Sequence, residues 1–167
     1  MTSHDALHEN ARRIEAFYAA FAVLDTDGMA AFYAPDVRFE DPVFALAGRE
    51  AVMAMWSMLC ETVKAKSREP WSLEASAIRA DAREGSAHWE ARYRFSATGR
   101  LVHNRIDATF VFRDGLVIRH VDRFDVWAWS RQALGAPGLL LGWIGFLRRQ
   151  LRDRAGARLA AWQARPR

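Results

Sequence analysis

Val37-Arg38-Phe39-Glu40-Asp41-Pro42-Val43, followed closely by Gly48-Arg49-Glu50, is the most informative segment of this chain. The pattern predicts a short strand that ends at a carboxylate, turns at Pro42 and leads into a helix. Val37, Phe39 and Asp41 alternate, so their side chains share one face of the strand. An acid on an apolar face indicates either an aspartate that only forms the turn or a functional site.

Helical periodicity lies on both sides of this segment. Residues 5–24 place apolar side chains at helical spacing, and residues 48–65 repeat the pattern over a second long helix. Between them, Asp27 is a candidate N-cap for a short helix that runs through Tyr33.

From Trp71 the apolar period changes from about 3.6 residues to 2, which predicts strands. The alternation recurs over residues 71–77, 87–95, 102–112 and 118–126, and a Gly-containing turn at residues 113–115 separates the last two. We expect Ile118, Phe124 and Val126 on the inward face of the last strand. Helices followed by an antiparallel meander predict an α+β fold.

The composition predicts one well-filled core. The chain has 167 residues, of which 51% are apolar, and its single cysteine, Cys60, excludes an internal disulfide and a multi-cysteine zinc site. No apolar run approaches the roughly 18 residues of a membrane span. With a polar N-terminus, these features predict a cytoplasmic protein.

Positive charge is concentrated in residues 131–167. This segment carries eight arginines and one acid, Asp153, although the net charge of the whole chain is only +4. The rest of the chain has no basic stripe interleaved with aromatic residues, so we do not expect a nucleic-acid partner.

Four polar residues interrupt the predicted apolar faces: Asp41, Asn104, His120 and Asp122. Burying such groups without partners costs roughly 2–7 kcal/mol each. Their grouping on one side of a small sheet predicts a shared cavity. Separate explanations remain open, namely a turn for Asp41, a backbone kink for Asn104 and a core pair for His120 with Asp122.

Four motifs follow one another along the chain: Phe39-Glu40-Asp41-Pro42-Val43, Gly48-Arg49-Glu50-Ala51-Val52, Phe112-Arg113-Asp114-Gly115 and Asp122-Arg123-Phe124-Asp125. In these motifs the chain resembles the nuclear transport factor 2-like superfamily, in its SnoaL-like and ketosteroid-isomerase-like branch. The resemblance implies a cone-shaped, curved antiparallel sheet wrapped around a long N-terminal helix. It implies a cone domain over residues 1–130, and a homodimer through the outer sheet face.

The same resemblance implies cofactor-independent chemistry on an apolar, polyketide-, steroid- or terpene-like small molecule. Asp41 takes the place of a general base, with His120 and Asp122 as its catalytic partners. The chain departs from the steroid isomerases, because Phe17 replaces the oxyanion-binding tyrosine and Ala108 the second acid. Asp122 instead matches one acid of the limonene-epoxide-hydrolase branch. The expected pocket residues are Phe17, Tyr18, Phe39, Trp56, Trp89, Asn104, Phe110 and Phe124.

Two functions therefore compete. One is an isomerase, cyclase, dehydratase or epoxide hydrolase with an aspartate base, and the other is a non-catalytic ligand-binding or assembly module of the same fold. Residues 131–167 are predicted to form a basic, tryptophan-containing helical extension. It is interpreted as an arm packed on the cone or its dimer mate, a helix on a membrane surface, or a tail for an anionic partner.

Overall fold

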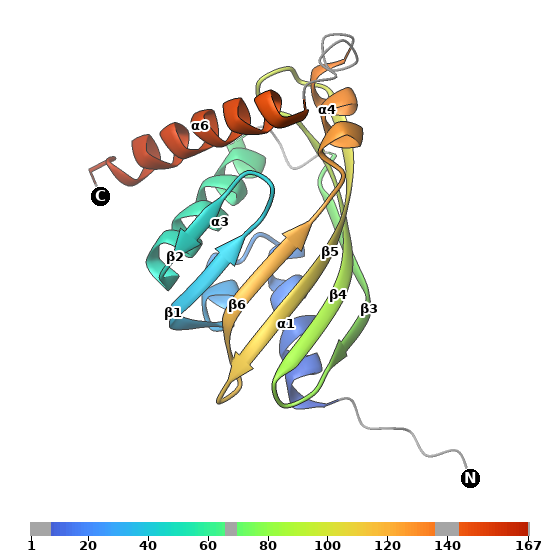
Figure 1. Cartoon of the computed structure of the whole chain (residues 1–167), viewed down its shortest axis with the longest axis vertical. Helices are drawn as coiled ribbons and strands as arrows, with labels where there is room; N and C mark the ends of the chain where they lie inside the picture. Colours follow the sequence, from blue (N-terminus) through green and yellow to red (C-terminus); the bar gives the residue numbers. More distant parts are fainter. Residues whose placement is uncertain (1–7, 66–69, 136–143, 167) are drawn as a thin grey trace.

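A single curved sheet dominates the computed structural model, which describes residues 8–65, 70–135 and 144–166 (Figure 1). Within these ranges the strand order is β2-β1-β6-β5-β4-β3. One neighbouring pair, β1 with β6, is parallel, and the other pairs are antiparallel. The strands are β1 Tyr33–Glu40, β2 Ala45–Ala47, β3 Ser72–Ala80, β4 Glu84–Arg94, β5 Leu101–Arg113 and β6 Leu116–Arg123.

Helices cover the concave side of this sheet and its open end (Figure 1). The described helices are α1 Glu9–Ala22, α2 Thr26–Ala30, α3 Arg49–Ala65, α4 Val126–Leu134 and α6 Ile144–Gln163. Helix α1 packs against β3, and α3 packs against β1. The predicted α+β fold, a curved sheet wrapped around the N-terminal helix, is confirmed.

The segment before β1 differs from its prediction. Asp25 rather than Asp27 is the N-cap of α2, because its carboxylate accepts the backbone N–H of Gly28 at 3.1 Å. The helix ends at Ala30, and β1 already begins at Tyr33. The register of β1 against β6 shifts between Tyr33 and Arg38, and this irregularity accommodates Pro35 within the strand.

The inward face of β6 also differs, because the strand contains an extra residue. Val111 pairs with Arg119 and Phe112 pairs with Val117, so Ile118 has no counterpart on β5. This bulge makes Val117, not Ile118, the fully buried residue at the start of the strand. Val126 is also misplaced in the prediction, since it begins α4.

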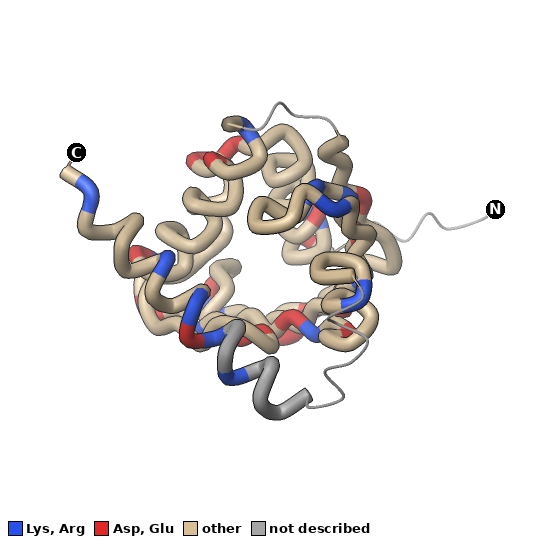
Figure 2. The backbone as a smooth tube through the Cα atoms, turned by 90° about the horizontal axis from the view of Figure 1, so that it is seen from above, with Lys and Arg blue, Asp and Glu red and all other residues tan. Residues whose placement is uncertain are grey.

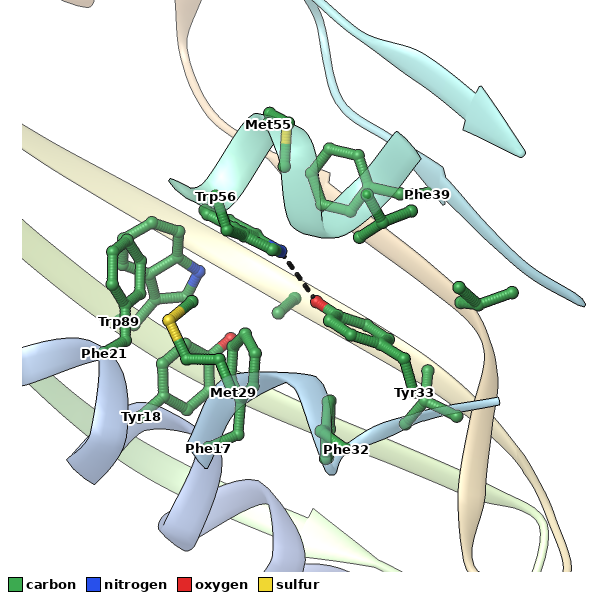
Figure 3. Close-up of a cluster of buried hydrophobic side chains, with 14 of the residues drawn as sticks. Phe17, Tyr18, Phe21, Met29, Phe32, Tyr33, Phe39, Met55, Trp56 and Trp89 are labelled. Atoms are coloured by element: carbon green, nitrogen blue, oxygen red, sulfur yellow. Dashed lines mark hydrogen bonds between the residues drawn. The ribbon is translucent and has the colours of Figure 1, made fainter. Parts of the chain in front are cut away.

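An aromatic core fills the space between α1, α3 and the sheet (Figure 3). Phe17, Phe39 and Phe110 belong to this core, and their ring centroids lie 6.0, 5.0 and 4.6 Å from the His120 ring. His120 itself is fully buried. A polar ring at the centre of an apolar cluster requires hydrogen-bond partners, which are described below.

The C-terminal helix α6 lies across the open end of the cone, beside α3 (Figure 1). Leu159 of α6 is buried, and the Trp162 Nε1–H donates to a Glu61 carboxylate oxygen at 2.9 Å. Arg152 Nε donates to the Pro42 carbonyl at 3.2 Å. No helix in the described ranges has the length and apolar character needed to cross a membrane. Within the extension expected over residues 131–167, residues 136–143 and 167 lie outside the described residues.

Candidate active site

A cavity of about 590 Å³ opens between α3, β4, β5 and α6. Its wall is mainly apolar, with Asp41, Asn104 and Asp122 among the polar exceptions. Three of the four polar residues that interrupt the predicted apolar faces therefore meet at one cavity. Of the other expected pocket residues, Trp56, Trp89 and Phe124 also line it.

Four expected pocket residues do not line this cavity: Phe17, Tyr18, Phe39 and Phe110. They pack in the core instead, because the chain fills the inner part of the cone with aromatic rings. His120 does not reach the cavity either, and lies behind Asp122. The Tyr18 side chain is 2% exposed, and its hydroxyl has no hydrogen-bond partner among the described residues.

Asp41 sits directly after β1, where its carboxylate holds the turn that leads to β2. Its Oδ1 accepts the backbone N–H groups of Val43 at 2.6 Å and Phe44 at 2.5 Å. The aspartate is therefore a turn-former and a cavity residue at once. Both hydrogen bonds fall on Oδ1, so Oδ2 has no bonded partner in the described part of the chain.

Burial raises the pKa of the Asp41 carboxyl to about 7. The two backbone N–H groups act in the opposite direction, and the negative charge of Asp122 raises the pKa further. A carboxyl group with this pKa exchanges its proton near neutral pH, which suits a general base or acid.

Asp122 is held by a chain of hydrogen bonds through the core. Trp56 Nε1–H donates to the Tyr33 hydroxyl oxygen at 3.0 Å, shown as a dashed line in Figure 3, so the Tyr33 O–H is directed to His120 Nδ1 at 2.8 Å. That arrangement places the His120 proton on Nε2, which donates to Asp122 Oδ1 at 2.9 Å. Trp89 Nε1–H approaches the same oxygen at 3.4 Å.

Sequence reasoning missed Tyr33, which completes this chain of hydrogen bonds. The prediction placed Tyr33 at the end of a helix, whereas it opens β1 and pairs with Val117 of β6. The sequence did contain a signal for a strand here, because Phe32 and Tyr33 are both aromatic and aromatic residues are enriched in strands.

Tyr93 and Asn104 add two neutral polar groups to the cavity wall. The Tyr93 oxygen accepts the Trp129 Nε1–H at 2.8 Å, which leaves its own O–H to donate. Burial raises the pKa of Tyr93 to about 12, although the Trp129 hydrogen bond opposes the shift, and the Asp41 charge adds to it. The Asn104 side-chain amide lies on the same wall, and no hydrogen bond links it to another described residue. Tyr93 was also missed as a site residue, although its alternation with Trp89 and Ala91 placed it inward.

Comparison with known proteins defines the class of this chain. The model of the SnoaL-like domain matches residues 14–120, more than half of the sequence, so the chain belongs to the SnoaL-like family. No curated protein matches it.

Solved structures show the same fold. One is described as a putative polyketide cyclase from Xanthomonas campestris, with 20% identity and a TM-score of 0.58 over 74% of this chain and 96% of that one. An LEH-like epoxide hydrolase of M. tuberculosis has 20% identity and a TM-score of 0.58, covering 80% of this chain and 93% of that one. TerC, co-crystallised with polyporic acid, has 18% identity and a TM-score of 0.61, covering 74% and 97%. These neighbours belong to the nuclear transport factor 2-like fold, which also includes ketosteroid-isomerase-like proteins.

Proposed function

We propose that this protein is a cofactor-independent enzyme that moves a proton on an apolar small molecule, with Asp41 as the general base. The observation that carries the proposal is the Asp41 carboxyl group on the wall of an apolar cavity, with a pKa of about 7. Isomerisation, cyclisation, dehydration and epoxide opening are reaction types that a positioned general base can promote. The solved neighbours described as a polyketide cyclase and an epoxide hydrolase support this range of reactions through the fold they share.

The polar groups around Asp41 take complementary roles. The free Oδ2 of Asp41 accepts the proton from the substrate, while the N–H groups of Val43 and Phe44 hold Oδ1 in place. The Tyr93 O–H and the Asn104 amide stabilise the oxygen that gains negative charge as the proton leaves. Asp122 returns a proton or orients water, because His120 and Trp89 fix one of its oxygens.

Base-catalysed ring opening of 5-nitrobenzisoxazole tests this proposal without knowledge of the natural substrate. The reaction removes one proton from carbon and releases a coloured phenolate. We expect the wild-type rate to rise with pH and to level off above pH 7, as the Asp41 carboxyl ionises. General bases contribute roughly 10²–10⁴-fold, so Asp41→Asn is expected to lose about 100-fold or more.

The matched control is Asp36→Asn, an exposed aspartate of the same strand that pairs with Arg113 at 2.6 Å. It is expected to leave the rate unchanged. Equal rates for wild type and Asp41→Asn contradict the assignment of the base. A wild-type protein that accelerates nothing over buffer supports the alternative, a non-catalytic ligand-binding module of the same fold.

A further inference from the structure

A second set of charged side chains lines the cavity, opposite in sign to the two aspartates. Arg94 at the end of β4 and Arg154 and Arg158 on α6 contribute to the wall. Figure 2 shows Lys and Arg positions recurring along α6. Among the ion pairs of the described residues, none joins these three arginines to a carboxylate. In the described part of the chain these three guanidinium groups therefore lack a carboxylate partner.

Neutral groups hold two of these guanidinium groups at the cavity. Arg158 Nη1 donates to Ser96 Oγ, and its Nη2 donates to Thr62 Oγ1, both at 3.1 Å. Arg94 Nη1 donates to the Gly99 carbonyl at 3.1 Å. Each guanidinium has five N–H donors, so these contacts position the groups and leave other donors for a ligand.

Arg158 is separated from the Asp41 end of the cavity. Arg152 donates to the Pro42 carbonyl beside Asp41, and its positive charge lowers the pKa of the Asp41 carboxyl, so it marks the part of α6 nearest Asp41. Arg154 and Arg158 follow two and six residues later, about 3 and 9 Å along the helix axis at 1.5 Å per residue. An apolar wall that includes Trp56, Trp71 and Trp89 completes the cavity. A ligand that matches all three features has an apolar body and one anionic end.

We propose that the cavity binds an amphipathic carboxylate, with its apolar body against the tryptophans and its carboxylate on Arg154 and Arg158. Guanidinium groups match a carboxylate in charge and in geometry, because they donate two parallel N–H bonds. Through Arg158, this orientation places the negative charge of the ligand about 9 Å along α6 from Arg152, which contacts the turn of Asp41. The inference rests on the proposed function, for which it names the substrate class.

The test uses two probes of the same shape, anthracene-9-carboxylate and 9-anthracenemethanol. Energy transfer from the tryptophans of the cavity to bound anthracene reports binding of either probe at pH 7.5. We expect the double variant Arg154→Gln/Arg158→Gln to lose about tenfold in affinity for the carboxylate and to bind the alcohol within twofold of wild type. Arg149→Gln, an exposed position of α6 outside the cavity wall, is expected to change neither.

Three results overturn the inference: no binding of the carboxylate by wild type, no loss in the double variant, or an equal loss for both probes. Failure of this inference is distinguishable from failure of the proposed function. Asp41→Asn should lose ring opening of 5-nitrobenzisoxazole and keep the arginine-dependent affinity for the carboxylate. Asp41-dependent ring opening without arginine-dependent binding of the carboxylate eliminates only the proposed ligand class. Arginine-dependent binding without Asp41-dependent ring opening eliminates only the general base.

Discussion

Replacing Asp41 with asparagine should make the folded protein more stable at neutral pH, and the size of the gain depends on pH. An asparagine Oδ1 can still accept the backbone N–H groups of Val43 and Phe44, so the turn after β1 is preserved. The substitution removes a carboxyl group whose pKa rises from 3.8 to about 7 when the chain folds. The difference between variant and wild type therefore isolates the titration of one group.

Proton binding by Asp41 determines whether the stability of wild type rises or falls with pH. Between about pH 4 and pH 7 the unfolded chain has released the Asp41 proton and the folded chain still holds it, so the stability of wild type falls as pH rises. About three pH units at 1.36 kcal/mol per unit give about 4 kcal/mol as an upper figure. Because Asp41 is only part-buried and lies on the wall of an open cavity, we expect about 2–4 kcal/mol.

Urea unfolding followed by tryptophan fluorescence at pH 4.5, 5.5, 6.5 and 8 measures this difference. The stability of Asp41→Asn relative to wild type should increase across the series and level off above pH 7. Asp36→Asn is the control. Arg113 lowers the pKa of the Asp36 carboxyl, so this group stays ionised throughout the pH series. A difference that stays constant from pH 4.5 to pH 8 would refute the assignment of a raised pKa to Asp41.

Two further substitutions test the core network and the outer face. Tyr33→Phe leaves Trp56 Nε1 and His120 Nδ1 without a partner and should lower the free energy of unfolding in urea by about 1–3 kcal/mol. Tyr18→Phe removes a hydroxyl that has no described partner, so it should change this free energy little. Equal losses for the two variants would contradict the network. We also expect a homodimer through the outer face of β4 and β5, where Glu90 bonds both His88 and His103. Sedimentation should show a wild-type dimer that Glu90→Lys dissociates and Glu15→Lys on α1 does not, and a monomeric wild type would eliminate this interface.

The sequence predicts the site best where its pattern is regular. Along β5 the alternation holds without interruption, so Val102, Asn104 and Ile106 share the inward face as expected. Alternation fails where one residue is inserted, as at Ile118, because a bulge reverses the face of every residue on one side of it. It also fails at Tyr33, since the pairing of β1 with β6 that makes Tyr33 a strand residue joins segments more than eighty positions apart.

The meeting of Asp41 and Asp122 is explained by a pairing that no local pattern reveals. Strands β1 and β6 run parallel, with Phe39 opposite His120 and Glu40 opposite Val121. The next step along both strands brings Asp41 to the level of Asp122, on the face that Phe39 and His120 share. Burial of the Asp41 carboxyl is the main cause of its raised pKa, and the negative charge of Asp122 at the same level adds to the shift. The backbone register therefore brings the two carboxyl groups together, and their neighbours give them different roles. His120 and Trp89 fix Asp122, whereas Asp41 is bonded by the backbone N–H groups of Val43 and Phe44.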